Sequence, residues 1–330
     1  MFDIPVVIFI FKRIKAIEII NRLAKIQPKI LYIIADGGRT FEESLECQKC
    51  REAVEKAISW NCKVIKNYAE LNRGVFENIG LGAKWVFRHE KKAIFLEDDN
   101  LPSISFFEFC KEMLDKYEND SRIFWICGTN YLGKTNYNDE SYYFTRHMLP
   151  CGWASWADKF TKYYDPYIED CFDNNICESI KYILHNNTLF NQYRHFWQSE
   201  RNRILHDLKP LSWDYQMDFA IKANNMYGIA PAVNLIENIG VDQFSIHGGS
   251  SFKDTMTKRF CSMESFELDF PLKHPKYVTL CPKYENKVAK ILIYPLTLRL
   301  KNKVVLFLRK LLKIPYGSSI HELVKRGKRK

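Results

Sequence analysis

Apolar residues occur in short continuous runs along the first part of the chain, and a segment with helical spacing of apolar positions follows most of these runs. Such runs are typical of strands buried on both faces, and their alternation with helices predicts an α/β fold with parallel strands. The predicted strands are residues 5–11, 29–35, 62–66, 93–96 and 123–128, and the predicted helices are residues 15–26, 41–60, 75–89 and 104–117.

Polar residues gather beyond the carboxyl ends of four of these strands, at residues 12–13, 36–39, 72–74 and 97–99. Parallel strands place their carboxyl ends at one edge of the sheet, where open α/β folds bind ligands. We therefore expect the four clusters to line one crevice. No GxGxxG or P-loop pattern follows the first strand, which argues against a dinucleotide enzyme or a kinase.

The most unusual cluster is acidic, because Glu97, Asp98 and Asp99 follow the apolar run 93–96 without a break. Adjacent carboxylates repel one another unless a cation neutralises them. Oxygen ligands suit a hard divalent ion such as Mg²⁺ or Mn²⁺. An acidic turn in solvent is the alternative, because an Asn and a Pro follow closely.

The second part of the chain is less regular. A helix is expected to begin at Ser212, which is a suitable N-cap. Asp214 would then lie in the first turn, where the helix dipole favours an acid whether or not that acid takes part in a reaction. Trp153 and Trp156 lie among small residues, and they form either a platform for a sugar ring or part of the core. Short strands are predicted at residues 142–146, 227–230 and 233–236, and His247 precedes two glycines.

The net charge of +10 is concentrated at one end of the sequence, since residues 287–330 contain thirteen Lys or Arg and one acid. This distribution argues against a nucleic-acid-binding body, and no DNA- or RNA-binding motif is present. Basic and apolar residues alternate at helical spacing over residues 287–313. Such a helix either lies on an anionic membrane surface or packs on the body with a solvated basic face.

The ten cysteines are spaced irregularly, and the apolar run at residues 5–11 is short and lacks the basic leader of a secretory signal. We therefore expect reduced thiols in a cytoplasmic protein, with the basic tail as the candidate contact to the inner face of the cell membrane. Cys47 and Cys50 form the one close pair in the sequence, and no second pair completes a zinc site.

Seven motifs, in this order, resemble those of nucleotide-diphospho-sugar transferases of the GT-A type. The resemblance is to the bacterial glycosyltransferase family 2-like group, also labelled hemolytic protein HlpA-like, and it covers about residues 4–250. The motifs are residues 11–13 (FKR), 35–39 (ADGGR), 71–74 (LNRG), 96–103 (LEDDNLPS), 151–156 (CGWASW), 213–216 (WDYQ) and 234–240 (NLIENIG), with His247 beyond them.

The resemblance implies a GT-A fold, which is Rossmann-like, with a mostly parallel central sheet flanked by helices; here it carries a helical, basic C-terminal extension. It also implies a division of labour along the chain. Residues 1–128 would form the nucleotide-sugar-binding half of the domain and residues 129–284 its acceptor-binding half. Residues 285–330 would form a basic amphipathic tail.

The acidic triplet and the Trp-Asp helix start also resemble the site of animal N-acetylglucosaminyltransferase I. By this resemblance Asp99, with His247, binds Mn²⁺ or Mg²⁺ on the donor diphosphate, and Asp214 is the catalytic base. Asp98 faces the ribose, and Glu97 acts nearby through water. The other implied donor contacts are Phe11, Arg13, Asp36, Arg39, Asn72 and Gly74, and the implied acceptor contacts are Gly152, Trp153, Trp156 and Trp213.

The function that these expectations imply is metal-dependent glycosyl transfer through a DXD-like motif. The donor would be a nucleotide-diphosphate sugar, a UDP-sugar by resemblance, and the acceptor a glycan or a lipid-linked glycan. Transfer would invert the anomeric carbon and serve bacterial surface polysaccharide or glycoconjugate synthesis.

Two alternatives remain open at this point. A sugar-nucleotide nucleotidyltransferase normally has a Gly-rich basic loop after its first strand, and residues 12–13 (Lys-Arg) have no such glycines. A non-catalytic carbohydrate-binding protein would not need the acidic triplet and Asp214 together.

Overall fold

The computed structural model describes residues 1–241 and 255–314. An eight-stranded sheet in the order β3-β2-β1-β4-β8-β6-β9-β7 forms its centre, and β5 and β10 pair beside it as a two-stranded sheet. The strands are β1 (Val6–Ile10), β2 (Ile30–Ala35), β3 (Lys63–Tyr68), β4 (Lys92–Glu97), β5 (Asn100–Pro102), β6 (Ile123–Cys127), β7 (Tyr142–Thr145), β8 (Trp153–Trp156), β9 (Tyr227–Pro231) and β10 (Ile236–Asn238).

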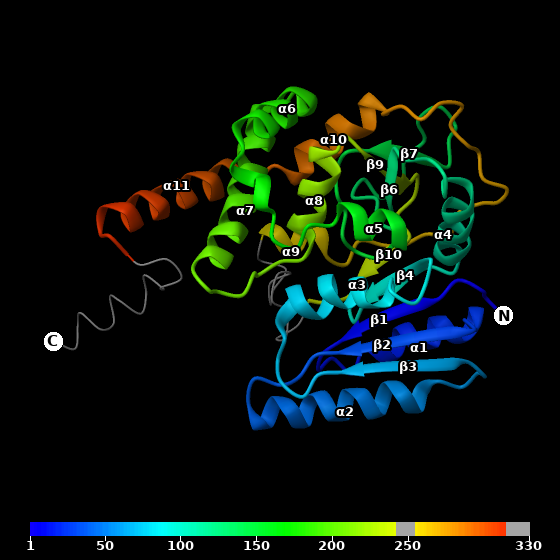
Figure 1. Ribbon diagram of the computed structural model, residues 1–330. Helices are drawn as coiled ribbons and strands as arrows, with labels where there is room; N and C mark the ends of the chain where they lie inside the picture. Colours follow the sequence, from blue (N-terminus) through cyan, green and yellow to red (C-terminus); the bar gives the residue numbers. More distant parts are fainter. Residues whose placement is uncertain (242–254, 315–330) are drawn as a thin grey trace.

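Helices surround this sheet and extend beyond it (Figure 1). They are α1 (Ala16–Ile26), α2 (Phe41–Ala57), α3 (Gly82–Val86), α4 (Ser105–Lys116), α5 (Ala157–Tyr163), α6 (Asn174–Leu184), α7 (Asn187–Leu205), α8 (Asp214–Ala223), α9 (Thr255–Phe260), α10 (Pro282–Leu292) and α11 (Leu296–Leu311). A π-helical segment, Phe76–Leu81, leads into α3, and a 3-10 turn, Glu169–Phe172, precedes α6.

The first half of the sheet is parallel. Val6 of β1 lies opposite Leu31 of β2 on one side and Ile94 of β4 on the other. Strand β3 continues the parallel arrangement beyond β2, so the carboxyl ends of these four strands meet at one edge. Strand β8 then runs antiparallel between β4 and β6.

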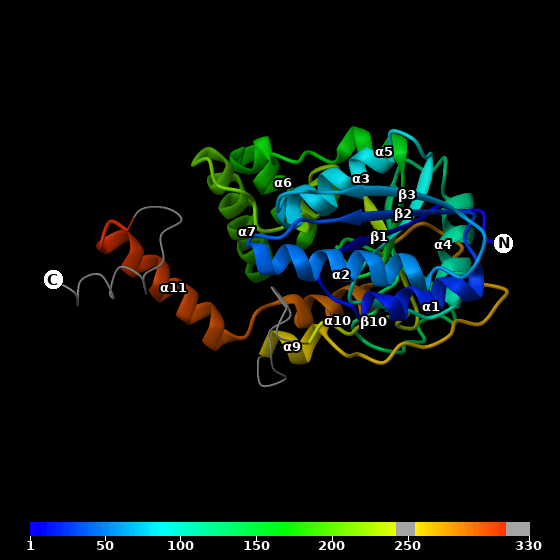
Figure 2. The same cartoon turned by 90° about the horizontal axis from the view of Figure 1, so that it is seen from below.

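Two hydrophobic cores lie on the two faces of the sheet because alternate strand residues point to opposite sides. Val6 and Ile8 of β1 belong to the core that includes α1 and α4, whereas Val7 and Phe9 belong to the core that includes α3, α5 and α8. In α1 the buried residues recur at helical spacing, as Ala16, Ile19, Ile20 and Leu23, which explains why this helix covers the sheet. Figure 2 shows α1 and α2 on one side of the strands and α3 and α5 on the other.

These features confirm the predicted fold class, an α/β, Rossmann-like sheet with helices on both faces and a helical, basic extension. Four of the seven strand pairings in the described part of the large sheet are parallel. Strands from both predicted halves belong to this one sheet. The division into halves at residue 128 stays a prediction.

Two parts of the sheet differ from the sequence-based prediction. Residues 153–156 form β8, with all four side chains buried, where the sequence indicated no strand. Strand β10 begins at Ile236, later than predicted, because it pairs antiparallel with the short strand β5 directly after the acidic triplet.

The C-terminal extension divides into two helices with different surroundings. Helix α10 packs on the body through Tyr284, Val288 and Ala289. Helix α11 has no buried residue and extends away from the body in both views (Figures 1 and 2). Within the described residues, no helix is long and apolar enough to cross a membrane.

Candidate functional site

The acidic triplet lies at the carboxyl end of β4, with Arg13 from the loop after β1 beside it. Arg13 Nη1 lies 2.9 Å from Asp98 Oδ1 and 2.8 Å from Asp99 Oδ2, so one guanidinium bridges two carboxylates. Because β1 and β4 are parallel neighbours, the loop after β1 and the end of β4 are brought together by the sheet itself. The prediction that polar strand ends converge is confirmed for this pair of strands.

Asp98 is buried and held by the backbone as well as by Arg13. The Phe11 N–H donates to Asp98 Oδ2 at 3.2 Å. Burial and the neighbouring Asp99 raise the pKa of Asp98, and Arg13 opposes this rise. Asp98 therefore connects the loop after β1 to the end of β4.

Asp99 lies under the loop that follows β10. Its backbone carbonyl accepts from Ile239 N at 2.8 Å, and its Oδ1 accepts from Asn100 Nδ2 at 2.7 Å. A Cβ atom added to Gly240 would lie 2.3 Å from Asp99 Oδ2, so only glycine permits this approach. Residues far apart in the sequence therefore fix the position of one carboxylate.

Glu97 and Asp214 are brought into electrostatic range of each other. Burial raises the pKa of Glu97 well above its usual value, and the charges of Asp99, Asp98 and Asp214 add to that rise. Contacts agree with this, because Trp213, directly before Asp214, stacks on Trp153 at 5.4 Å, and Trp153 stacks on Phe95 of β4 at 4.0 Å. This confirms that the fold brings these two motifs together, although more than a hundred residues separate them.

Helix α8 begins at Asp214, so Trp213 holds the N-cap position predicted for Ser212, while the Ser212 side chain still bonds to the first turn. Ser212 Oγ accepts from the N–H groups of Asp214 at 3.2 Å and Tyr215 at 3.4 Å, and it also donates to the Asp214 carboxylate. Further along α8, Asp218 forms a buried ion pair with Lys222. Trp197 of α7 donates its indole N–H to Asp218, which attaches α8 to α7.

Asp36 organises the neighbouring loops at the ends of β2 and β3. Its carboxylate accepts from the N–H groups of Gly37, Arg73 and Gly74 at 2.6 to 2.9 Å and from Asn72 Nδ2 at 3.0 Å. A carboxylate has about four lone-pair sites, so these bonds occupy all of them. The sequence predicted that Asp36 contacts the nucleotide. In the structure its carboxylate instead holds the backbone of the neighbouring loops, a role that the sequence could not reveal.

Arg39 and Phe11 lie together in a rim next to the acidic triplet, since the Phe11 N–H bonds to Asp98. Glu43 of α2 holds both Arg39 and Lys12, with Lys12 Nζ at 2.7 Å and Arg39 Nε at 2.8 Å from its oxygens. Hydrogen bonding from Arg39 holds the pKa of Glu43 far below its usual range. Both cations lie within 5.6 Å of the Phe11 ring centroid, so an aromatic face and two positive charges share this rim.

The acceptor-binding role predicted for Gly152, Trp153, Trp156 and Trp213 is wrong in this structure. The three tryptophans are 1–3% exposed, so none of them offers a face to a sugar ring. Trp153 stacks on Phe95 of β4, with ring centroids 4.0 Å apart. Gly152 is also buried. It packs against Ile236 with φ +61°, and its N–H donates to Asn100 Oδ1.

The carboxylates at the end of β4 fit the implied metal only together with a substrate. Within the described residues, no group of three or more His, Cys, Asp and Glu side chains is arranged to hold a metal ion. Mg²⁺ is usually held by one or two carboxylates together with substrate phosphates rather than by an all-protein cage. Asp99, with a side chain that is 17% exposed, fits a site of that kind. The second predicted metal ligand, His247, lies outside the described residues.

Asn100 and Gly240 are structural supports of the site that the sequence analysis did not assign. Asn100 connects Asp99 to the Gly152 backbone, and Gly240 leaves room for Asp99. The position of Asn100 directly after the triplet was an available signal. Gly240 had no such signal, because its closeness to Asp99 depends on the pairing of β10 with β5.

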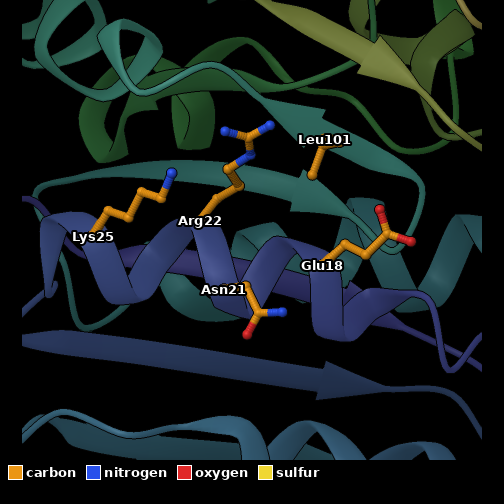
Figure 3. Close-up of a pocket in the computed structure, with 5 residues that line it drawn as sticks. All are labelled: Glu18, Asn21, Arg22, Lys25 and Leu101. Atoms are coloured by element: carbon orange, nitrogen blue, oxygen red, sulfur yellow. The ribbon is translucent and has the colours of Figure 1, made fainter.

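A pocket of about 320 Å³ lies on another part of the surface, along α1. Glu18, Asn21, Arg22 and Lys25 line it from the helix, and Leu101 of β5 lies opposite (Figure 3). Its charges have both signs, and none of the predicted site residues lines it. We assign it no part in the chemistry.

Neither a comparison with protein-family models nor one with curated proteins finds a match. Among solved structures, the chain is similar to a UDP-glucose pyrophosphorylase complexed with UDP-glucose, at 8% identity and TM-score 0.37, over 72% of this chain and 94% of that chain. It is also similar to mouse xyloside xylosyltransferase 1, at 10% identity and TM-score 0.38, over 85% of this chain and 100% of that chain. A mannose-1-phosphate geranyltransferase from Thermus thermophilus matches at 12% identity and TM-score 0.30, over 72% of this chain and 75% of that chain. Similarities at this level assign no function, so the function proposed below rests on the geometry of the site.

Proposed function

We propose that the protein is a glycosyltransferase that moves a sugar from a nucleotide-diphosphate sugar, such as a UDP-sugar, to a glycan or lipid-linked acceptor. The observation that carries this proposal is the placement of the acidic triplet at the carboxyl edge of the parallel strands, next to the start of α8. Trp213, directly before Asp214, stacks on Trp153 at 5.4 Å, and Trp153 stacks on Phe95 of β4 at 4.0 Å. Bacterial surface polysaccharide or glycoconjugate synthesis is the process that such a reaction would serve.

In the proposed reaction, the bond between the anomeric carbon and the diphosphate oxygen breaks, and its electron pair leaves with the diphosphate. The acceptor oxygen forms the new bond to the anomeric carbon, and the acceptor proton passes to the Asp214 carboxylate. A general base of this kind typically accelerates a reaction about 10²- to 10⁴-fold. Attack from the side of Asp214, opposite the leaving group, gives inversion.

Asp99 is the residue proposed to hold Mn²⁺ or Mg²⁺ together with the donor diphosphate. Such an ion neutralises charge on the leaving phosphate oxygens. Arg13 keeps Asp98 and Asp99 in place, while Phe11, Lys12 and Arg39 form a rim suited to the nucleotide through one aromatic face and two cations. Asn72 and Gly74 act through the loop that Asp36 braces.

A sugar-nucleotide nucleotidyltransferase is the rival enzyme. The loop after β1 disfavours it, because Arg13 points back to the carboxylates of β4 and no glycine-rich segment is present to enclose phosphates.

Product analysis separates the two reactions. The purified protein is incubated with a panel of nucleotide sugars and Mn²⁺, and the products are identified by mass spectrometry. The proposal expects release of a nucleoside diphosphate and a free or transferred sugar. Formation of a nucleoside triphosphate from added pyrophosphate would identify a nucleotidyltransferase instead.

A further inference from the structure

Helix α11 presents an exposed apolar stripe along its whole length, and no element within the described residues covers it. Its members recur three or four residues apart, so they share one face of the helix. Each side chain is between 53% and 65% exposed, although burial is worth about 1.5–3 kcal/mol for residues of this size. The stripe consists of Leu296, Leu300, Val304, Phe307 and Leu311.

Basic side chains lie on both sides of this stripe, and Leu306 and Leu308 are exposed outside it. At 3.6 residues per turn, Lys303 flanks the stripe on one side and Lys301 on the other, while Arg299 and Lys310 lie further round. No acidic residue occurs between positions 286 and 314. Two copies of this helix would therefore bring like charges together along any shared apolar contact, which argues against self-association.

An anionic lipid surface complements both parts of α11. Apolar side chains enter the boundary between headgroups and acyl chains, and each Lys or Arg near the surface adds about 1 kcal/mol of attraction. The flanking lysines can keep their ammonium groups at the headgroups while their stems follow the apolar stripe.

The root of α11 is firmly attached to the body. Arg259 of α9 donates to the carbonyls of Ile291 and Ile293, both at 2.8 Å. Gln192 of α7 donates to the Leu292 carbonyl at 2.9 Å and accepts from the Tyr294 N–H at 2.8 Å. The position of the root relative to α7 and α9 is therefore fixed before Pro295 redirects the chain into α11.

This root lies beside Asp214. The Tyr294 ring lies 5.4 Å from the Phe196 ring, which in turn stacks on Tyr215 at 4.8 Å, and Tyr215 follows Asp214 directly. The Asp214 charge also contributes to raising the pKa of the Tyr294 hydroxyl, after burial, so the two groups are in electrostatic range. The candidate base is therefore at the end of the body from which α11 departs.

We propose that α11 binds the surface of an anionic lipid bilayer and holds the Asp214 end of the crevice at that surface, so that the acceptor is lipid-linked. The choice of acceptor rests on the proposed function, whereas the lipid binding does not. Acceptor hydroxyls would then reach Asp214 from the membrane, and the soluble donor would enter over the rim at Phe11 and Arg39.

Vesicle flotation with the full chain tests the lipid binding. Vesicles of phosphatidylcholine alone are compared with vesicles that also contain phosphatidylglycerol, at low and high salt. We expect binding to the anionic vesicles, weakened by salt. In the stripe variant, with Leu300→Ser, Phe307→Ser and Leu311→Ser combined, binding should fall at least tenfold. A matched variant with Phe172→Ser, Tyr182→Ser and Leu205→Ser, which are also exposed, should bind like the wild type.

Equal binding to neutral vesicles, or no binding to either kind, would overturn the proposal. A wild-type dimer that becomes monomeric in the stripe variant, measured by light scattering without lipid, would assign the stripe to a second copy instead.

The acceptor is tested with a polyprenyl-diphosphate-linked sugar in the same anionic vesicles. The stripe variant should lose at least tenfold in transfer to this acceptor while it hydrolyses a soluble nucleotide sugar at the wild-type rate. Equal loss of both activities, or loss of neither, contradicts the proposed role of α11. A protein that binds vesicles but turns over no nucleotide sugar would instead refute the proposed function and leave the lipid binding intact.

Discussion

Arg13 balances the charge of the acidic triplet. It lies within 2.9 Å of carboxylate oxygens on both Asp98 and Asp99, and its side chain is only 12% exposed. Largely buried charges depend on their ion-pair partners for stabilisation. Without the guanidinium, the two carboxylates would lose this cation and remain poorly solvated. The site therefore depends on Arg13 for its structure before any substrate binds.

Replacing Arg13 with alanine is expected to lower the free energy of unfolding by about 3 kcal/mol, because two largely buried carboxylates lose their cation. Chemical denaturation of the purified variant measures this change. The control is Arg122→Ala, which breaks an exposed pair with Asp120 and should cost less than about 1 kcal/mol. Equal effects of the two substitutions would contradict the structural role given to Arg13.

Replacing Asp214 with asparagine should keep donor binding and reduce transfer about 10²- to 10⁴-fold, because the amide cannot accept the acceptor proton. Donor affinity is measured by calorimetry and transfer by product formation. Asp173→Asn is the matched control, since Asp173 also lies at a helix start, where it caps α6. An Asp214→Asn variant with wild-type turnover would remove Asp214 as the base.

At the level of elements, the pairing of β5 with β10 completes the site. Asn238 lies opposite Asn100 in this pair, and the loop that follows β10 places Gly240 against Asp99. The β1 and β4 strand ends supply the charged groups, and the β5–β10 ladder fixes their geometry.

The Gly240→Ala substitution is expected to displace the Asp99 carboxylate, because the new Cβ would lie 2.3 Å from Asp99 Oδ2. A displacement of about 1 Å at a reacting centre can cost about a hundredfold in rate. Transfer kinetics and thermal unfolding of Gly240→Ala should be compared with those of Gly133→Ala. A Cβ at Gly133 meets nothing within 4 Å, and the strain of its positive φ should cost only about 1–2 kcal/mol of stability. Unchanged transfer in Gly240→Ala would show that Asp99 does not depend on this loop.

The sequence predicted the elements whose pattern is local. Strand β4 is a continuous apolar run. The position of the acidic triplet at its end therefore follows from the local sequence and does not depend on long-range pairing. By contrast, Trp153 faces Phe95 because β8 inserts between β4 and β6, and this long-range pairing leaves no signal in residues 151–156 themselves. The bracing role of Asp36 likewise depends on backbone N–H groups from the loop after β3, which a sequence pattern does not locate.

At the scale of the whole molecule, charge and chemistry are separated. The body contains the crevice and is nearly neutral, whereas the segment from residue 287 onward holds the positive excess. Helix α10 packs on the body and α11 leaves it. The point where the extension departs lies near Asp214, because the Tyr294 ring contacts Phe196, which stacks on Tyr215. This arrangement favours a donor and an acceptor that approach from different directions.

The central claim is that the acidic edge of the sheet binds a nucleotide-diphosphate sugar through Asp99 and a divalent ion. The most direct measurement is nucleotide-sugar turnover by the wild type, first with Mn²⁺ and then after EDTA has removed the metal. The same turnover is measured for the Asp99→Asn variant, and Asp115→Asn, at an exposed position, is the control. The account predicts turnover that EDTA abolishes, that Mn²⁺ restores, and that Asp99→Asn lacks although Asp115→Asn retains it. Turnover that persists in EDTA and in Asp99→Asn, or the absence of turnover with every nucleotide sugar tested, would contradict it.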